Sequence, residues 1–281
     1  MHGEQGIGDE IMYASMLPDL LARGARIVLA CTPPLVALMR DAFPAVQVVA
    51  HPRGNPAAWH TALPEWTRQI APVDWQCPLG SLARWLRRNT ADFPRQPYLR
   101  AEPARVDAMR QHLLALRPAA GVLRVGIAWC GNLDNPHGRA KSLTPEQLLP
   151  LAQVPGVQLV GLQSRQYAAD ARRVPGLNLL DMSAHTDDFA DLAALASQMD
   201  LVISIDSSYV HLCGALGLPV WLPLRRNCDW RWGWRRADCI WYPNLRLFHQ
   251  HVDGEWQPVI DGLRTALQQR ASAPSDPPSR P

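Results

Sequence analysis

The chain has 281 residues, which is long for one small domain and sufficient for two of middling size. Apolar residues make up 47 % and charged residues 19 %, with a formal net charge of +3 at pH 7. This composition supports sizeable cores and gives no indication of a nucleic-acid or membrane surface. The six cysteines form neither a CxxC pair nor a zinc spacing, and no signal peptide or membrane-spanning run is visible. We therefore expect free thiols, a reducing cytoplasmic compartment and no transmembrane segment.

The first block of the chain alternates helix and strand patterns. It opens on a flexible glycine turn formed by Gly3, Gly6 and Gly8, which only Met1 and His2 precede. Apolar spacing predicts helices over 9–24, 33–44 and 103–117, strands over 26–31 and 46–50, and a short strand followed by a helix within 74–88.

A hinge is predicted at 117–121, where a helix end, a proline and a glycine separate the two blocks. The second block repeats the alternation. Strands are expected over 123–132, 157–163, 177–183, 200–206 and 219–224, and helices over 144–154, 187–199, 207–217 and 256–269.

Strands that alternate with helices in two blocks predict two parallel, doubly wound sheets. Ligands of such sheets bind beyond the carboxyl ends of the strands, so two facing domains would enclose a cleft. The predicted units are an N-terminal domain over 1–117, a C-terminal domain over 122–269 and a disordered tail over 270–281, which is polar and rich in proline.

The sharpest chemical signal is the segment 201–220, in which a buried strand ends at Asp206 and a helix starts at Ser207 and Ser208. The first turn of a helix has unpaired amides and a partial positive charge, and His211 follows one turn later, so this is a candidate anion site. The alternative is an ordinary N-cap with a packed core histidine, and spacing alone does not separate the two.

Cations occur in two further segments. Arg139 and Lys141, the only lysine, lie in a loop before the helix at 144–154 and could reach a phosphate, or could simply be solvated. The segment 227–243 interleaves tryptophans with arginines that could stack on sugars or bases, or form a peripheral apolar cluster; Arg231 is the residue for which we expect a functional role.

The opening turn matches neither GxxxxGK[ST] nor GxGxxG, and its carboxylates would repel a phosphate. Asp9 at the mouth of a cleft suits a general base better. Helix capping is the alternative role for this side chain.

The ordered set of motifs resembles the family 9 glycosyltransferases, typified by the ADP-heptose lipopolysaccharide heptosyltransferases and closest to relatives associated with tetratricopeptide repeats. The matching segments are "GEQGIGDEIMYASMLPDL", "VGIAWCGN" with "RAKSL", "LVGLQ", "DMSAHTDDFADLAALASQMDLVISIDSSYVHLCGALGLPVW" and "DWRWGW…WYPNLRLFHQ", covering about 3–268.

The resemblance implies a GT-B fold, with two Rossmann-like domains and a nucleotide-sugar donor bound mostly by the second. It implies that Asp9 is the base, that Lys141 contacts the donor phosphates, and that Asp206, Ser207, Ser208 and His211 correspond to an Asp-Thr-Gly-x-x-His donor motif, with Ser-Ser in place of Thr-Gly. We add Gln163, which ends "LVGLQ", together with Arg139 and Arg231, to the expected donor-binding residues.

The family has a strand directly before the glycine turn, and this sequence has only two residues there. We therefore expect the first strand of the N-terminal domain to be missing and Met1 to be an internal start.

The expected function is inverting transfer of a sugar from a nucleotide-diphosphate donor to a hydroxyl of a glycan, lipopolysaccharide or protein, with no metal or other cofactor. ADP-, GDP- and UDP-sugars are all compatible with the sequence. The alternatives are a nucleotide-sugar 2-epimerase and a non-catalytic nucleotide-sugar-binding module.

Overall fold

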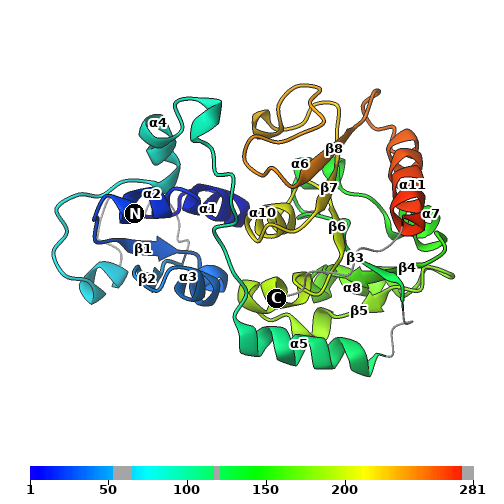
Figure 1. Cartoon of the computed structure of the whole chain (residues 1–281), viewed down its shortest axis with the longest axis horizontal. Helices are drawn as coiled ribbons and strands as arrows, with labels where there is room; N and C mark the ends of the chain where they lie inside the picture. Colours follow the sequence, from blue (N-terminus) through cyan, green and yellow to red (C-terminus); the bar gives the residue numbers. More distant parts are fainter. Residues whose placement is uncertain (53–64, 117–120, 274–281) are drawn as a thin grey trace.

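The computed structural model describes residues 1–52, 65–116 and 121–273 and places two α/β halves side by side (Figure 1). The first half contains a parallel pair of strands, β1 (Val28–Cys31) and β2 (Gln47–Ala50). Its helices are α1 (Ile7–Ala14), α2 (Leu17–Ala22), α3 (Val36–Ala42) and α4 (Ala83–Leu86), with 3-10 turns at Pro33–Leu35, Glu65–Gln69, Leu79–Leu82 and Thr90–Asp92.

Although the sequence led us to expect that the first strand of the N-terminal domain is missing, residues 1–3 lie in an extended position directly before the glycine turn. His2 forms parallel bridges to Ala30 on one side and to Pro78 on the other. The Ala30 amide donates to the Met1 carbonyl at 2.9 Å, and the Gly3 amide donates to the Ala30 carbonyl at 3.0 Å. Residues 1–3 therefore occupy a position between two extended segments, which is the place of a central strand.

The second half contains one six-stranded parallel sheet with the order β5-β4-β3-β6-β7-β8. Its strands are β3 (Leu123–Ala128), β4 (Val157–Gly161), β5 (Leu180–Asp181), β6 (Leu201–Ser204), β7 (Val220–Leu224) and β8 (Leu245–His249). The chain order reverses between β3 and β6, which makes the carboxyl ends of these two strands the switch point at which doubly wound sheets bind ligands. The second-half sheet predicted from the sequence is thus confirmed.

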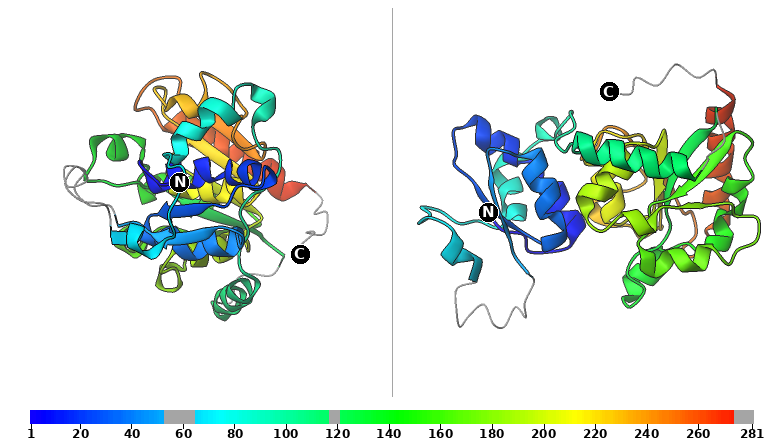
Figure 2. Two further views of the ribbon diagram at one scale, coloured as in Figure 1. Left: turned by 90° about the vertical axis from the view of Figure 1, so that its left-hand side faces the viewer. Right: turned by 90° about the horizontal axis from the view of Figure 1, so that it is seen from below.

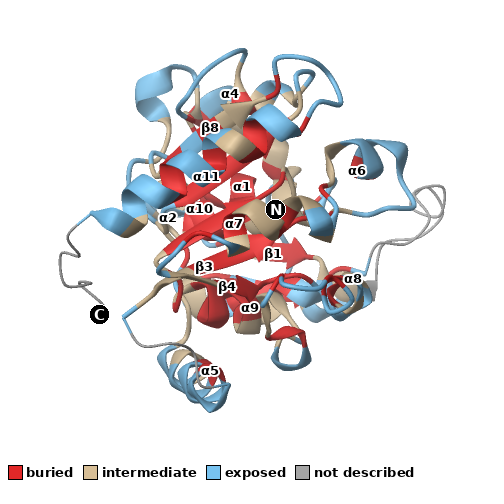
Figure 3. Ribbon diagram, turned by 90° about the vertical axis from the view of Figure 1, so that its right-hand side faces the viewer, coloured by how far each residue is buried: buried red, intermediate tan, exposed pale blue. Residues whose placement is uncertain are grey.

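Helices cover both faces of this sheet (Figures 1 and 3). Along β6, Leu201 and Ile203 pack on the side of α7 (Leu149–Ala152) and α11 (Gln257–Ser272), whereas Val202 packs on the side of α9 (Phe189–Ala196) and α10 (Ser208–Ala215). All four residues of β6 are buried, and this explains why the strand reads as a continuous apolar run.

The core on the α10 side continues into the first half. Ile11 and Met12 of α1 belong to the same buried cluster as Val210 and Leu212 of α10. Figure 2 shows α1 lying against the second half at this point. The helix pair α1–α10 is therefore the main junction between the halves, and it brings their two N-terminal turns close together.

The chain crosses between the halves through residues 97–102 and α5 (Pro103–Ala115). Although the predicted N-terminal domain includes α5, this helix packs against α9 of the second half. Arg105 lies 3.3 Å from the Asp188 carboxylate and also pairs with Asp191. The helix therefore lies apart from β1 and β2, because its charged partners are on α9.

Several predicted elements differ in detail. The helix expected over 9–24 is two helices that break at Ser15, and three elements were not expected: α6 (Pro136–Lys141), α8 (Arg165–Ala171) and β8. The helix predicted over 144–154 is a 3-10 turn at Pro145–Leu148 that continues into α7. Helix α11 extends to Ser272, so the start of the predicted tail is helical, while 274–281 and most of the predicted hinge (117–120) lie outside the described residues.

Candidate functional site

A cavity of about 670 Å³ lies between the two halves, at the carboxyl ends of β3 and β6. The first half contributes the α1 turn, and the second half contributes the turns after β3, β4 and β6 and the loop after β7. Its polar lining includes Asp9, Asn135, His137, Lys141, Gln163, Ser164, Tyr209, Asp206, Ser207, Ser208, His211, Asp229 and Arg231. Eight of the nine predicted site residues therefore line one cavity.

The N-terminus of α10 opens on this cavity. Ser207 occupies the N-cap position in an extended conformation, but its side chain makes no capping hydrogen bond; its hydroxyl lies 3.4 Å from the Ser204 hydroxyl. Ser207 and Ser208 both line the cavity. Because the cap side chain does not occupy the first-turn amides, the arrangement is that of an anion site rather than of a self-capped helix.

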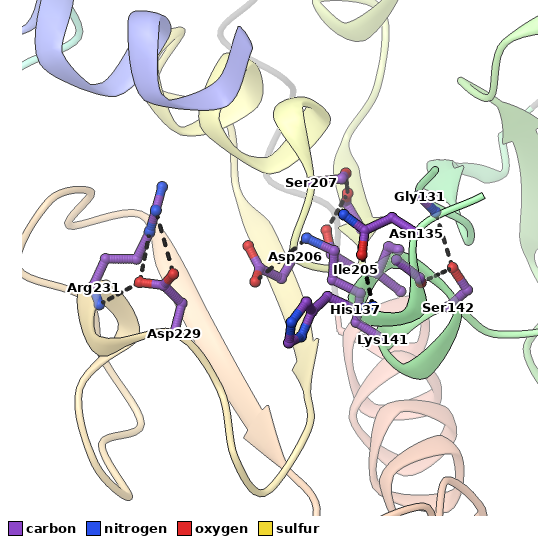
Figure 4. Close-up of polar contacts among 12 residues, drawn as sticks. Gly131, Asn135, His137, Lys141, Ser142, Ile205, Asp206, Ser207, Asp229 and Arg231 are labelled. Carbon is purple, nitrogen blue, oxygen red and sulfur yellow. Dashed lines mark hydrogen bonds and ion pairs between the residues drawn. The ribbon is translucent and has the colours of Figure 1, made fainter. Parts of the chain in front are cut away.

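Lys141 is the cation that faces this helix terminus (Figure 4). Its ammonium lies 3.8 Å from the Asp206 carboxylate, and both side chains are partly exposed. A contact of this length is a loose ion pair, so the ammonium retains capacity to contact a second anion. Arg139 differs from the prediction: its guanidinium donates to the Leu133 carbonyl at 2.6 Å, and the residue is not part of the cavity lining.

Asp9 faces the cavity from α1 and has two partners. One carboxylate oxygen accepts from the Gly6 amide at 2.7 Å, and the other accepts from Nη1 of Arg231, also at 2.7 Å. The helix begins at Ile7, so Asp9 is its third residue, not its first as the sequence suggested, and its carboxylate caps the amide of the N-cap residue Gly6. The capping role and the cavity position thus both hold, and they are compatible because each carboxylate oxygen has two lone pairs.

Glu10 does not share the position of Asp9. Its buried carboxylate accepts from the Thr32 amide at 2.8 Å and from the Thr32 hydroxyl. A Cβ placed on Gly3 would lie 2.4 Å from the Glu10 carboxyl carbon, so glycine is required at this position. Gly3 and Gly8 have negative or extended φ values. They are needed because the side chains of Glu10 and His211 pack closely against them, so the turn that the sequence suggested to be flexible is tightly packed.

Arg231 links the two halves. Asp229 accepts from its Nε at 2.9 Å and from its Nη2 at 3.3 Å, and Asp9 of the first half accepts from its Nη1 (Figure 4 shows the Asp229 contacts). Burial lowers the pKa of the Arg231 guanidinium, but the hydrogen bonds and charges of Asp229 and Asp9 outweigh burial, so the net pKa is raised. Arg231 is thus a fixed cation, with Asp229 as a partner that sequence reasoning missed although it lies two residues away.

His211 is buried in the wall of the cavity. Its Nδ1 lies 3.0 Å from the Tyr242 hydroxyl, and its ring stacks on Trp232 with ring centroids 5.1 Å apart. Burial, followed by the positive charges of Arg231 and Lys141, holds the pKa of His211 well below its ordinary value. The imidazole is therefore neutral at pH 7 and acts as a hydrogen-bonding group rather than as a cation.

The low pKa of His211 has a consequence for stability. Unfolding restores the ordinary histidine pKa, so this group has no effect above about pH 6.5, and it lowers the free energy of unfolding by up to about 1.4 kcal/mol per pH unit below that value. Urea denaturation of the wild type and of His211→Gln between about pH 8 and about pH 5 isolates the contribution of His211 to the pH dependence of the free energy of unfolding. We expect the wild type to lose stability more steeply on acidification; parallel curves would contradict a neutral buried imidazole.

Gln163 lines the cavity, but its amide serves the backbone. Its Oε1 accepts from the amides of Trp129 and Cys130, both at 3.1 Å, and its Nε2 donates to the Cys130 carbonyl at 2.9 Å. Gln163 therefore fixes the turn after β3, which carries cavity residues, through both lone pairs of Oε1 and one of the two N–H groups of Nε2. The residues missed by sequence reasoning, Tyr209 and Tyr242, occur within the segments that carry the family resemblance, where only their neighbours were considered.

Among residues 1–52, 65–116 and 121–273, no three histidine, cysteine or acidic side chains are grouped as a metal site would require. Within the same residues, no helix combines the length and apolar character needed to cross a bilayer. The six cysteines are all free.

Comparison with known proteins gives solved structures that match nearly the whole chain. ADP-heptose lipopolysaccharide heptosyltransferase II of E. coli matches with a TM-score of 0.65 and 17 % identity over 97 % of this chain and 98 % of that chain. A family 9 glycosyl transferase from Veillonella parvula DSM 2008 matches with a TM-score of 0.60 and 10 % identity over 98 % and 89 %. E. coli heptosyltransferase WaaC with ADP-2-deoxy-2-fluoro heptose matches with a TM-score of 0.56 and 12 % identity over 96 % and 98 %.

Protein FlbA of Caulobacter vibrioides is 31 % identical over 287 residues, covering 96 % of this chain and 46 % of FlbA. The chain thus spans about half the length of this relative. No family model matches the chain.

The two halves and their order define a GT-B fold, and the GT-B fold predicted from the sequence is confirmed. The solved structures with this fold that the chain resembles include a family 9 glycosyl transferase and two heptosyltransferases, in agreement with the resemblance that its motifs indicated.

Proposed function

We propose that this chain is an inverting glycosyltransferase that moves a sugar from a nucleotide-diphosphate donor to a hydroxyl of an acceptor. The observation that supports it best is the position of Asp9, which faces the same cavity as Lys141 and the α10 terminus across the junction of the halves. A carboxylate opposite an anion site is the arrangement that a single displacement at an anomeric carbon needs.

In the proposed reaction, Asp9 accepts the proton of the acceptor hydroxyl while the acceptor oxygen bonds to the anomeric carbon. The bond between that carbon and the phosphate oxygen breaks from the opposite side, and the nucleoside diphosphate leaves with both bonding electrons. The α10 amides at Ser207 and Ser208 and the Lys141 ammonium would stabilise the charge on the diphosphate without a divalent metal.

The acceptor proposed here is a glycan, a lipopolysaccharide or a protein, because each offers a hydroxyl. We place the reaction in the cytoplasm, since six free thiols agree with a reducing compartment.

A second candidate is a nucleotide-sugar-binding module without catalysis. It is supported by the two contacts of Asp9, because one carboxylate oxygen is held by the Gly6 amide and the other by Arg231. Donor binding without turnover on any acceptor would favour this candidate.

Thermal unfolding in the presence of ADP-, GDP- and UDP-sugars tests donor binding. A true donor at about 100 times its Kd raises the free energy of unfolding by about 2.7 kcal/mol. Lys141→Met should abolish most of this gain, whereas Arg139→Gln is the matched control, because its guanidinium already bonds to the Leu133 carbonyl outside the cavity. EDTA is expected to leave the shift unchanged.

Product assays follow with the donor that binds. Transfer to an acceptor supports the transferase, while free epimerised sugar formed from donor alone would indicate an epimerase instead. A chain that none of these nucleotide sugars stabilises would contradict the proposed function.

A further inference from the structure

A chain of buried hydroxyl groups leads from the end of α1 to the imidazole in the cavity wall. The Tyr98 hydroxyl donates to the Ile11 carbonyl at 3.1 Å and lies 3.4 Å from the Tyr242 hydroxyl. The Tyr242 hydroxyl in turn lies 3.0 Å from Nδ1 of His211. The three side chains come from the crossing segment, the loop after β7 and α10.

The Ile11 carbonyl determines which way the protons point. This carbonyl is near the C-terminal end of α1. In a continuing helix it would accept from the Ser15 amide, but that amide donates to the Met12 carbonyl at 3.3 Å instead. A carbonyl buried in this way needs a donor, and the single proton of the Tyr98 hydroxyl supplies it. Tyr98 then has no proton left to give to Tyr242.

The Tyr242 proton is consequently available to Nδ1 of His211, which is the nearer of its two neighbours. An imidazole that accepts at Nδ1 carries its own proton on Nε2. Nδ1 points to Tyr242, and the opposite edge of the ring lies beside the α1 turn: a Cβ placed on Gly8 would be 2.7 Å from Cδ2 and 3.4 Å from Nε2 of His211. The Nε2 proton is thus on the side of the ring that faces the cavity.

The surroundings hold both rings in this arrangement. His211 stacks on Trp232, and a Cβ placed on Gly214 would lie 2.6 Å from the ring of Tyr242. Gly214 therefore admits the Tyr242 ring against α10. Burial, ahead of the neighbouring tyrosine, raises the pKa of Tyr242 well above its ordinary value, so the hydroxyl keeps its proton.

We propose that Tyr98 and Tyr242 are positioning residues that fix His211 in its Nε2–H tautomer, so that the imidazole donates a hydrogen bond to the donor diphosphate. This role rests on the proposed function, since it requires a phosphate in the cavity. A donor is needed there because a neutral imidazole with a free lone pair toward the cavity would repel phosphate oxygens. The bond from Tyr98 to Ile11 also makes the tautomer depend on contact between the halves.

NMR of the full chain labelled with 15N-histidine reads the tautomer directly at neutral pH. The His211 signals are identified by their loss in His211→Gln. We expect Nε2–H in the wild type and a mixture of tautomers in Tyr242→Phe, with a smaller change in Tyr98→Phe. Tyr13→Phe, a buried tyrosine of α1 outside this hydroxyl chain, should leave the spectrum unchanged.

Binding of pyrophosphate, ADP, GDP and UDP is then measured by calorimetry. Tyr242→Phe should weaken binding of the best of these about tenfold, the scale of one lost hydrogen bond to a charged group. If Tyr242→Phe does not fold, Gly214→Ala displaces the same ring while it keeps the hydroxyl, and it should give the same mixture of tautomers.

An Nδ1–H tautomer in the wild type, or an unaltered tautomer in Tyr242→Phe or in Gly214→Ala, would overturn the inference. Equal affinity of the wild type and Tyr242→Phe for the diphosphates would overturn its functional part. If the wild type binds none of the four probes, the proposed function fails and this functional part fails with it, whereas the tautomer assignment is decided by the spectra alone.

Discussion

Asp9→Asn is expected to lower turnover by about 10²-fold or more, because it removes the group that accepts the acceptor proton. Donor affinity should stay nearly unchanged, since the side chain keeps its shape and the Asn oxygen can still accept from the Gly6 amide. Steady-state kinetics with the donor that binds, together with calorimetry of donor binding, separate the two effects.

The adjacent carboxylate is the control for this change. Glu10→Gln makes the same chemical replacement one residue away, on a side chain that bonds to Thr32 and lies outside the cavity lining. We expect it to leave turnover within about threefold of the wild type, well below the effect of a lost general base. Turnover in Asp9→Asn equal to that of the wild type would remove Asp9 from the proposed role and leave it as a capping residue.

Arg231→Gln is expected to lower the free energy of unfolding by about 2 to 3 kcal/mol. The change removes the guanidinium that Asp9 and Asp229 share, and loss of one partner of a buried ion pair typically costs about 3 to 5 kcal/mol. We expect a loss at or below the bottom of this range because the Arg231 and Asp9 side chains remain 13 % and 15 % exposed. Urea denaturation measures the loss.

Arg235→Gln is the matched control in the same loop. Its guanidinium lies over the ring of exposed Trp234, so its removal should change stability by less than about 0.5 kcal/mol. A second check adds Asp229→Asn to Arg231→Gln: the asparagine should cost less in that background than alone, because it removes one of the two unpaired carboxylates. Equal losses from Arg231→Gln and Arg235→Gln would show that the link between the halves contributes no stability.

The ion pair between Asp9 and Arg231 also bears on catalysis. Both oxygens of the Asp9 carboxylate already accept a hydrogen bond, so an acceptor hydroxyl would have to use one of the remaining lone pairs. Arg231 is nevertheless held by Asp229 through two nitrogens, so it orients the Asp9 carboxylate from a fixed position. The geometry is thus consistent with a base that is aligned by its cation, and also with a purely structural bridge, and the Asp9→Asn kinetics distinguish these roles.

Local patterns in the chain were sufficient to predict the second-half sheet and the helix terminus at its switch point. Buried strands such as β6 are continuous apolar runs, and the polar turn after Asp206 follows directly from where such a run ends. These features depend on residues that are neighbours in the sequence, and periodicity records them. The resemblance of the ordered motifs to family 9 glycosyltransferases added the expectation that the two halves face one another.

Other features depend on partners that are far apart in the sequence. Asp9 and Arg231 are separated by 222 positions, and His211 and Tyr242 by 31, so no spacing rule predicts either contact. The same holds for Gln163, whose amide is used by the turn after β3, and for Arg139, which the short helix α6 directs toward Leu133. Residue types and local periodicity are properties of the chain itself, whereas the partner of a buried polar group is set by which elements pack together, and that choice exists only in the folded protein.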